Sequence, residues 1–354
     1  MLMTTYPEGR YIGFYPSRPV WVGKTLPEAA RLPEGQFRWD AMAQIELSRS
    51  IPVTELHICR DGLVILRIDT LQAGIFNAMS LPPQSVWESA GPLLNVYLSH
   101  CNALRLLLEA GLWKHDRIGL GTTPIRKGEA LSLEFRHQML VGATIPEGEG
   151  ADLIRQRTPG KEDLFTTNSR ILISAPIAEE AFAIYLSIAN DWEKVKILSE
   201  TCSCIGEQNR INWEGCIIHA WFVIEYFLNS SWMEYILTAS DTEKISFTRD
   251  MRDFVTGRDF SAAFISNALA QAGELPKADF EIIDRLRKIR NGIIHNQALV
   301  EKLRARLQGQ QIESASKAIS QNDCSDAVSQ VERFINKSMG IGIELPEYFV
   351  WTYP

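Results

Sequence analysis

The sequence has no paired cysteine motif, no long apolar run and no excess of positive charge. Its six cysteines are scattered, and its most apolar run, residues 216–228, is short and contains His219 and Glu225. The 36 Lys and Arg residues are outnumbered by 43 Asp and Glu residues, giving a net charge of −7. The lack of paired cysteines argues against a structural zinc site, and the lack of a long apolar run argues against a membrane-spanning helix. The lack of excess positive charge argues against a strongly basic, histone-like protein that coats nucleic acid. The first residues also lack the apolar core of a signal peptide, so we expect reduced thiols and a cytoplasmic protein.

Motifs of the common phosphate-binding and hydrolytic sites are missing too. The chain contains no G-x-x-x-x-G-K-[ST] loop, no H-E-x-x-H pair and no G-x-S-x-G elbow. The glycine-rich segment 119–124 lacks a strand–loop–helix context and is interpreted as a turn. We therefore expect no metal ion and no cofactor, and we interpret Cys101 and Cys216 as small core residues on helices.

Length and composition favour a soluble protein of two domains. The 354 residues are 45% apolar and 22% charged, which is ordinary for globular proteins. We predict an α+β fold in which a mixed α/β module (1–150) precedes an all-α helical bundle (176–340). Residues 151–175 are interpreted as a linker with a closing strand, and 341–354 as a C-terminal tail.

The first half has the pattern of a small sheet with one helix. Segments 10–15 and 20–23 are aromatic and β-branched, and the two apolar runs around Asp61 and Gly62 predict a β-hairpin. Helical spacing predicts a helix over 86–112 that ends at a Gly111 cap, and strands follow within 118–142. Since no catalytic motif appears here, we interpret this module as a possible sensor of an unknown trigger molecule.

The second half is expected to be helical, with a polar linker before it at 146–169. Apolar periodicity predicts helices near 177–202, 212–238, 243–254, 259–272, 279–297 and 314–338. The first 175 residues contain 18 basic and 18 acidic residues, so the whole acidic excess falls in this half.

One segment of this acidic half is basic. Glu301 is its only acid, and its seven basic residues are Arg285, Arg287, Lys288, Arg290, Lys302, Arg304 and Arg306. A local basic ridge indicates an anionic ligand. The alternative is a solvated helix face on which these cations pair with Asp284 and Glu281.

The same segment carries a polar motif, Arg290-Asn291 followed by His295. We expect these residues at the edge of an apolar stripe formed by Leu286, Ile289, Ile293 and Ile294. At about 100° per residue, Asn291 and His295 lie about 40° apart around the helix, and Arg290 lies about 140° from His295. A glycine inside a helix, such as Gly292, lowers the stability of the helix by about 1 kcal/mol relative to alanine. Its presence here indicates that another backbone or a ligand approaches this turn closely.

This motif resembles the HEPN family, whose signature is R-x(4–6)-H, and is closest to its Apea-like branch. Arg290 and His295 have four residues between them, and Asn291 provides the polar residue after the arginine. The upstream helix at 212–238 is similar to an early HEPN helix, in which Glu225 matches an acidic residue near the motif. The resemblance covers about 176–340, and His295 is not followed by the H-x-Y continuation found in some HEPN toxins.

The resemblance implies a metal-independent endoribonuclease, typically a toxin or phage-defence effector, that acts as a homodimer. Arg290, Asn291 and His295 would be its catalytic residues, with Glu225 supporting them. The RNA 2′-hydroxyl is the nucleophile, so the protein needs to supply proton transfer and charge stabilisation. The dimer would form through the helices at 212–238 and 279–297. The remaining basic residues would bind RNA, namely Arg285, Arg287, Lys288, Lys302, Arg304 and Arg306.

Two other functions remain open at this point. Many HEPN domains have lost catalysis, so the bundle could be a scaffold for nucleotide binding or dimerisation. The bundle could also regulate an unrelated activity in residues 1–175, although no catalytic motif there supports this. For single residues, the alternative for Arg290 is an ion pair with Asp284 or Glu281, and for His295 a hydrogen bond to a carbonyl at a helix end.

Overall fold

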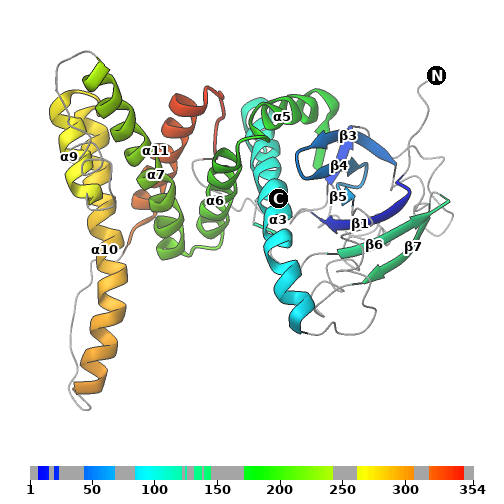
Figure 1. The fold of residues 1–354 in the computed structure, drawn as a ribbon, viewed down its shortest axis with the longest axis horizontal. Helices are drawn as coiled ribbons and strands as arrows, with labels where there is room; N and C mark the ends of the chain where they lie inside the picture. The colour runs from blue at the N-terminus through cyan, green and yellow to red at the C-terminus, as the bar shows by residue number, and fades with distance from the viewer. Residues whose placement is uncertain are drawn as a thin grey trace. The chain divides into compact units, whose positions relative to one another are not determined.

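The computed structural model describes residues 7–15, 20–23, 44–67, 84–121, 124–125, 131–137, 139–144, 171–241, 261–306 and 319–346. The chain divides into two compact units, Met1–Cys202 (unit 1) and Ser203–Pro354 (unit 2). Unit 1 contains an antiparallel sheet, and the described part of unit 2 is helical (Figure 1). The predicted α+β fold is confirmed.

The main sheet of unit 1 is antiparallel and has the order β3-β4-β5-β1-β6-β7. Its strands are β1 (Gly9–Phe14), β3 (Ile45–Ile51), β4 (Thr54–Cys59), β5 (Val64–Arg67), β6 (Leu131–Arg136) and β7 (Met139–Thr144). A second, two-stranded sheet pairs β2 (Val20–Gly23) in parallel with β8 (Ile171–Ser174). The segment expected to close the first module therefore pairs with a strand about 150 residues before it, a contact that local sequence signals do not reveal.

The predicted hairpin at Asp61 and Gly62 is confirmed as the β4–β5 pair. Gly62 adopts a φ of 83°, which explains why a glycine is favoured there. The Asp61 carboxylate accepts hydrogen bonds from the Leu63 amide (3.1 Å) and from the Tyr15 hydroxyl (2.8 Å). The turn is thus held by its own aspartate and by the end of β1.

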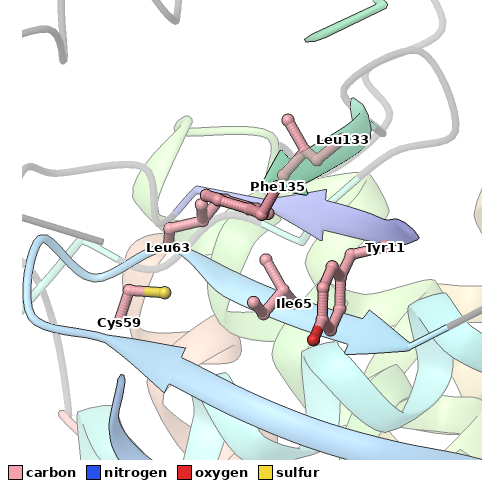
Figure 2. Close-up of a cluster of buried hydrophobic side chains, with 6 residues drawn as sticks. All are labelled: Tyr11, Cys59, Leu63, Ile65, Leu133 and Phe135. Carbon is pink, nitrogen blue, oxygen red and sulfur yellow. The ribbon is translucent and has the colours of Figure 1, made fainter. Parts of the chain in front are cut away.

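Both faces of the sheet are buried at its central strands β1, β4 and β5. Side chains alternate between the faces of a strand, and Ile12, Phe14, Leu56 and Leu66 fill one face. The other face carries a cluster of buried side chains, shown in Figure 2: Tyr11, Cys59, Leu63, Ile65, Leu133 and Phe135. The neighbouring strands β1 and β5 are accordingly apolar on both faces, whereas β3 exposes Ser48, Arg49 and Ser50.

Helix α3 (Gln84–Asp116) is longer than predicted, and the predicted cap at Gly111 is wrong. Gly111 lies inside the helix, where a Cβ atom would be only 3.0 Å from the Cγ2 atom of Ile177 in α5 (Ala175–Ile188). The glycine therefore serves close packing of α3 against α5 and does not terminate the helix.

The single helix predicted over 177–202 is two helices. Helix α5 ends at Ile188, and α6 (Trp192–Asn209) begins after Asp191, whose carboxylate accepts a hydrogen bond from the Lys194 amide at 3.3 Å. The division between the units falls within α6, after Cys202. The helical segment expected to begin at 176 is therefore shared between them, because α5 packs on α3 in unit 1.

Unit 2 contains four further described helices: α7 (Trp213–Asp241), α9 (Ala262–Ala272), α10 (Lys277–Arg306) and α11 (Gln321–Met339). They match the helices predicted near 212–238, 259–272, 279–297 and 314–338. Ser261 and Gly273 cap α9, and Ser320 with Asp323 forms a capping box at α11. The predicted helix at 243–254 and the linker at 146–169 lie outside the described residues.

Helix α7 packs against α9, α10 and α11, and α10 packs against α9 and α11. Helices α10 and α11 run antiparallel, since Asp279 pairs with Arg333 near one end and Arg285 pairs with Asp326 further along. Arg285 also lies 3.6 Å from Asp323, in the first turn of α11. The residues of α10 after Arg285 therefore approach and pass the start of α11, and this end of α10 extends beyond the other helices of unit 2 (Figure 1).

Candidate functional site

Arg290 lies on the core-facing side of α10 and not at its edge. The buried residues of this part of the helix are Ile283, Leu286 and Ile293. Around the axis, Arg290 is about 20° from Ile283 and about 40° from Leu286. The predicted apolar stripe is also wrong at Ile294, which is 40% exposed. The difference arises because the core direction is set by where α7 and α11 lie, which helical periodicity alone does not give.

The Arg290 guanidinium is half-buried and its described partner is neutral. Its Nη1 atom donates a hydrogen bond to Oδ1 of Asn291 at 3.1 Å. Within the described part of the chain, Arg290 makes no ion pair. The two acids considered as partners are engaged elsewhere, since Asp284 binds Arg287 and Lys288, and Glu281 lies 3.8 Å from Lys277. A half-buried cation without a carboxylate is suited to an incoming anion.

Three residues of the basic ridge do have acidic partners. Asp284 lies 2.7 Å from Arg287 and 2.6 Å from Lys288, and hydrogen bonds from Lys288 and then Arg287 lower the pKa of its carboxyl group. Arg285 pairs with Asp323 and Asp326 of α11. This part of the ridge therefore matches the alternative of a solvated, internally paired helix face.

For the other predicted site residues of α10, the structure describes only the backbone. His295, Lys302, Arg304 and Arg306 all lie within the helix, and their side chains fall outside the described part of the structure. Positions 290 and 295 are separated by about 140° around the axis, and positions 291 and 295 by about 40°. Within one chain, positions 290 and 295 therefore lie on different faces of the same helix.

Glu225, the predicted supporting acid, is half-buried on α7. Its Oε2 atom accepts a hydrogen bond from the indole N–H of Trp221 at 3.1 Å, one turn earlier in the same helix. The structure does not bring Glu225 into a described contact with Arg290 or Asn291. Its described role is to accept the hydrogen bond of the indole N–H of buried Trp221.

Among the described residues, no packing contact requires a glycine at position 292. A Cβ atom built on it would meet nothing within 4 Å. The close backbone approach expected from the sequence is therefore absent from the chain itself, as far as the structure describes it. The open space beside Gly292 lies on the same turn of α10 as Arg290 and Asn291.

Helix α7 exposes a line of large apolar side chains. Ile218, Phe222, Met233 and Leu237 are each between 38% and 51% exposed. At about 100° per residue they fall within about 100° of one another around the axis, so they form a single stripe. We call these four residues the α7 stripe. Exposed apolar stripes of this kind mark contact surfaces.

Cofactor and membrane features are also addressed by the structure. Among the described residues, no three His, Cys, Asp or Glu side chains are arranged to hold a metal ion. No helix in the described ranges is both long and apolar enough to cross a membrane. Comparisons of the chain with protein-family models, with curated proteins and with solved structures find no match.

Proposed function

We propose that this protein is a metal-independent endoribonuclease of HEPN type, a cytoplasmic toxin or phage-defence effector that cleaves RNA through its own 2′-hydroxyl. The observation that carries the proposal is the partial burial of Arg290 together with the neutral partner of its guanidinium. Arg290 has a half-buried guanidinium in the motif helix, bonded to a neutral amide and without a carboxylate partner among the described residues. Fully buried arginines are almost always paired with an acid, and Arg290, which is partly buried, has a neutral partner instead.

Arg290 is suited to stabilise the transition state. Attack of the 2′-hydroxyl on phosphorus adds negative charge to the phosphate oxygens. A planar guanidinium donates two parallel hydrogen bonds to such oxygens. Its bond to Asn291 at 3.1 Å fixes the guanidinium in orientation and leaves its remaining N–H groups for phosphate.

His295 supplies the proton transfer in this mechanism. An imidazole titrates near neutral pH, so it can accept the proton of the 2′-hydroxyl or donate one to the departing 5′-oxygen. Asn291 precedes position 295 by about one turn on nearly the same side of α10. The products are a 2′,3′-cyclic phosphate and a free 5′-hydroxyl.

The active form in this proposal is a homodimer. Positions 290 and 295 of α10 lie about 140° apart around the helix axis, so a second copy is the simplest source of the complementary group. The α7 stripe, the exposed Ile294 and the open space at Gly292 provide surface for that copy. Light scattering at micromolar concentration tests this step, and a monomer that stays monomeric with RNA present contradicts it.

RNA binding outside the catalytic centre is assigned to the basic residues of α10. Lys302, Arg304 and Arg306 lie in the last two turns of the helix, beyond the point where Arg285 meets α11. We assign the larger share of binding to these three, because Arg285, Arg287 and Lys288 are already paired with acids. Unit 1 would then carry the response to a trigger molecule.

A second function is favoured by those same ion pairs. A basic ridge in which three of the seven cations are paired with acids fits a bundle that dimerises or binds nucleotide without cleaving RNA. In that case Arg290 would bind a phosphate and His295 would have no catalytic role. The two functions differ in whether bound RNA is cut.

The test is RNA cleavage by the full-length protein and four variants. Loss of the proton-transfer group in His295→Ala should lower the rate about 10²–10⁴-fold, and Arg290→Ala should lower it about 10²–10³-fold. Arg290→Lys should fail to restore activity, because an ammonium lacks the two-pronged geometry. Asn291→Ala should be milder than either alanine variant.

A matched control is His115→Ala, which removes an exposed histidine that pairs with Glu180 in unit 1. It should cleave RNA at the wild-type rate, and all variants should melt as cooperatively as the wild type. Full activity in a folded His295→Ala variant would refute the catalytic assignment. RNA binding without cleavage by every form, wild type included, would favour the scaffold function instead.

A further inference from the structure

Three buried thiols from three different helices meet in unit 2. Cys204 lies in α6, Cys216 in the first turn of α7 and Cys324 in the first turn of α11, and all three are fully buried. The Sγ atoms of Cys204 and Cys216 are 3.6 Å apart. Cys324 also lies close enough for its thiol and that of Cys216 to shift each other's pKa. Cys216 therefore stands between two possible sulfur partners.

Backbone carbonyls hold the outer two thiols in place. Cys204 Sγ lies 3.5 Å from the carbonyl oxygen of Cys216, and Cys324 Sγ lies 3.7 Å from the carbonyl oxygen of Trp213. Both carbonyls belong to the first turn of α7. The three sulfur atoms are thus arranged around the start of this helix, where it follows the turn from α6.

The cysteines of unit 1 differ in this respect. Cys59, Cys101 and Cys202 are equally buried, but within the described residues none of them has a sulfur atom as partner. They provide an internal control for any chemistry that needs two adjacent thiols.

We propose that Cys216 is an oxidation site at which the bundle of unit 2 is covalently locked, through a disulfide either to Cys204 or to Cys324. Only one of the two bonds can exist at a time, because both use the same sulfur. The oxidant is a peroxide or a small-molecule disulfide. The inference stands independently of the proposed nuclease activity.

With a peroxide, the reaction proceeds in two balanced steps. A Cys216 thiolate attacks one peroxide oxygen, the O–O bond breaks, and water leaves as the sulfur becomes a sulfenic acid. The Cys204 or Cys324 thiol then attacks this sulfur, forming the S–S bond and releasing a second water. The two thiols together lose two electrons and two protons, and the peroxide is reduced to two waters. A bond to Cys204 can later pass to Cys324 by thiol–disulfide exchange.

Burial makes the closed bundle slow to react. The hydrogen bond with Cys204, and also burial, raise the pKa of Cys216, while the nearby Cys216 thiol and burial raise the pKa of Cys324. Since the thiolate is the reactive form, oxidation follows opening around the start of α7. A disulfide formed there would hold α7 to α6 or to α11 and raise the melting temperature.

The experiment uses the full-length protein treated under native conditions with hydrogen peroxide or oxidised glutathione. Free thiols are then blocked with N-ethylmaleimide, and unreduced peptides are identified by mass spectrometry. Wild type should yield the 204–216 or 216–324 linkage and a melting temperature several degrees higher. Cys324→Ala should yield only 204–216, Cys204→Ala only 216–324, and Cys216→Ala neither. Cys202→Ala, the matched control in unit 1, should oxidise as wild type does.

The proposal is overturned if oxidised wild type contains no intramolecular disulfide while its thiols react after unfolding. It is equally overturned if folded Cys216→Ala forms a linkage as readily as wild type. Should Cys216→Ala fail to fold, the two outer variants decide, because a shared central sulfur requires each of them to retain one linkage and lose the other.

Discussion

The acid sensitivity of unit 1 can be worked out from one buried histidine. His100 lies on α3 with 2% of its surface exposed, and its Nδ1 atom is 2.7 Å from the Tyr185 hydroxyl. Burial disfavours the charged imidazolium and lowers the pKa of His100 from 6.5 to about 4. A shift of about 2.5 units corresponds to about 3 kcal/mol at 1.36 kcal/mol per unit.

The direction in which pH changes the free energy of unfolding depends on whether the folded or the unfolded state binds more protons. Below pH 6.5 the unfolded chain takes up a proton at His100 while the folded protein does not, so the free energy of unfolding falls as the pH falls. This contribution is complete above pH 6.5 and is lost progressively down to about pH 4. His57, whose pKa is also lowered chiefly by burial, acts in the same direction.

The assay is urea unfolding of wild type and His100→Asn at a series of pH values from 7.5 to 4. Asparagine can keep a hydrogen bond to Tyr185 but does not titrate, so wild type should lose about 3 kcal/mol more than the variant across this range. Tyr185→Phe is the control, because it removes the hydrogen bond and leaves the burial that causes the shift. It should stay acid-sensitive. Parallel pH profiles for wild type and His100→Asn would refute the reasoning.

Three further features of unit 2 can each be tested by substitution. Gln330→Met should stabilise the protein by about 1–3 kcal/mol in urea unfolding, because both amide atoms of this buried side chain lack a partner among the described atoms. The control is Gln208→Met, which should destabilise the protein because this buried glutamine does have interactions. Gly292→Ala should raise the stability by about 1 kcal/mol while lowering RNA cleavage, and unchanged cleavage would show that nothing approaches this turn. Ile211→Asn should stabilise by about 1 kcal/mol, since a β-branched residue at a φ of 60° is strained; a loss of stability would mean that the isoleucine packs usefully.

Local sequence signals were sufficient for most elements of the fold. The hairpin at Asp61 and Gly62 and the helices α7, α9 and α10 follow from turn residues and apolar periodicity, which are properties of neighbouring residues. The parallel pairing of β2 with β8 depends on residues about 150 positions apart. Gly111 was misinterpreted for a related reason, because its role is to admit Ile177 from another helix.

The candidate site was predicted only in part. The motif pattern selected Arg290 and Asn291, which the structure brings into contact, but periodicity assigned Arg290 to the edge of a stripe whose direction depends on neighbouring helices. The ion pairs of Arg285 with α11 and the meeting of three thiols at Cys216 also depend on helix packing. Contacts between elements distant in sequence leave no local pattern.

The most direct test of the central proposal is the chemistry of the cut itself. The full-length protein is incubated in excess EDTA with an RNA oligonucleotide and with the same oligonucleotide carrying one deoxyribose at the cleaved position. We expect cleavage of the RNA to a 2′,3′-cyclic phosphate and a 5′-hydroxyl, and no cleavage at the deoxyribose, because the missing 2′-hydroxyl is the nucleophile. Loss of cleavage in EDTA, or equal cleavage at the deoxyribose, would contradict a mechanism based on Arg290 and His295.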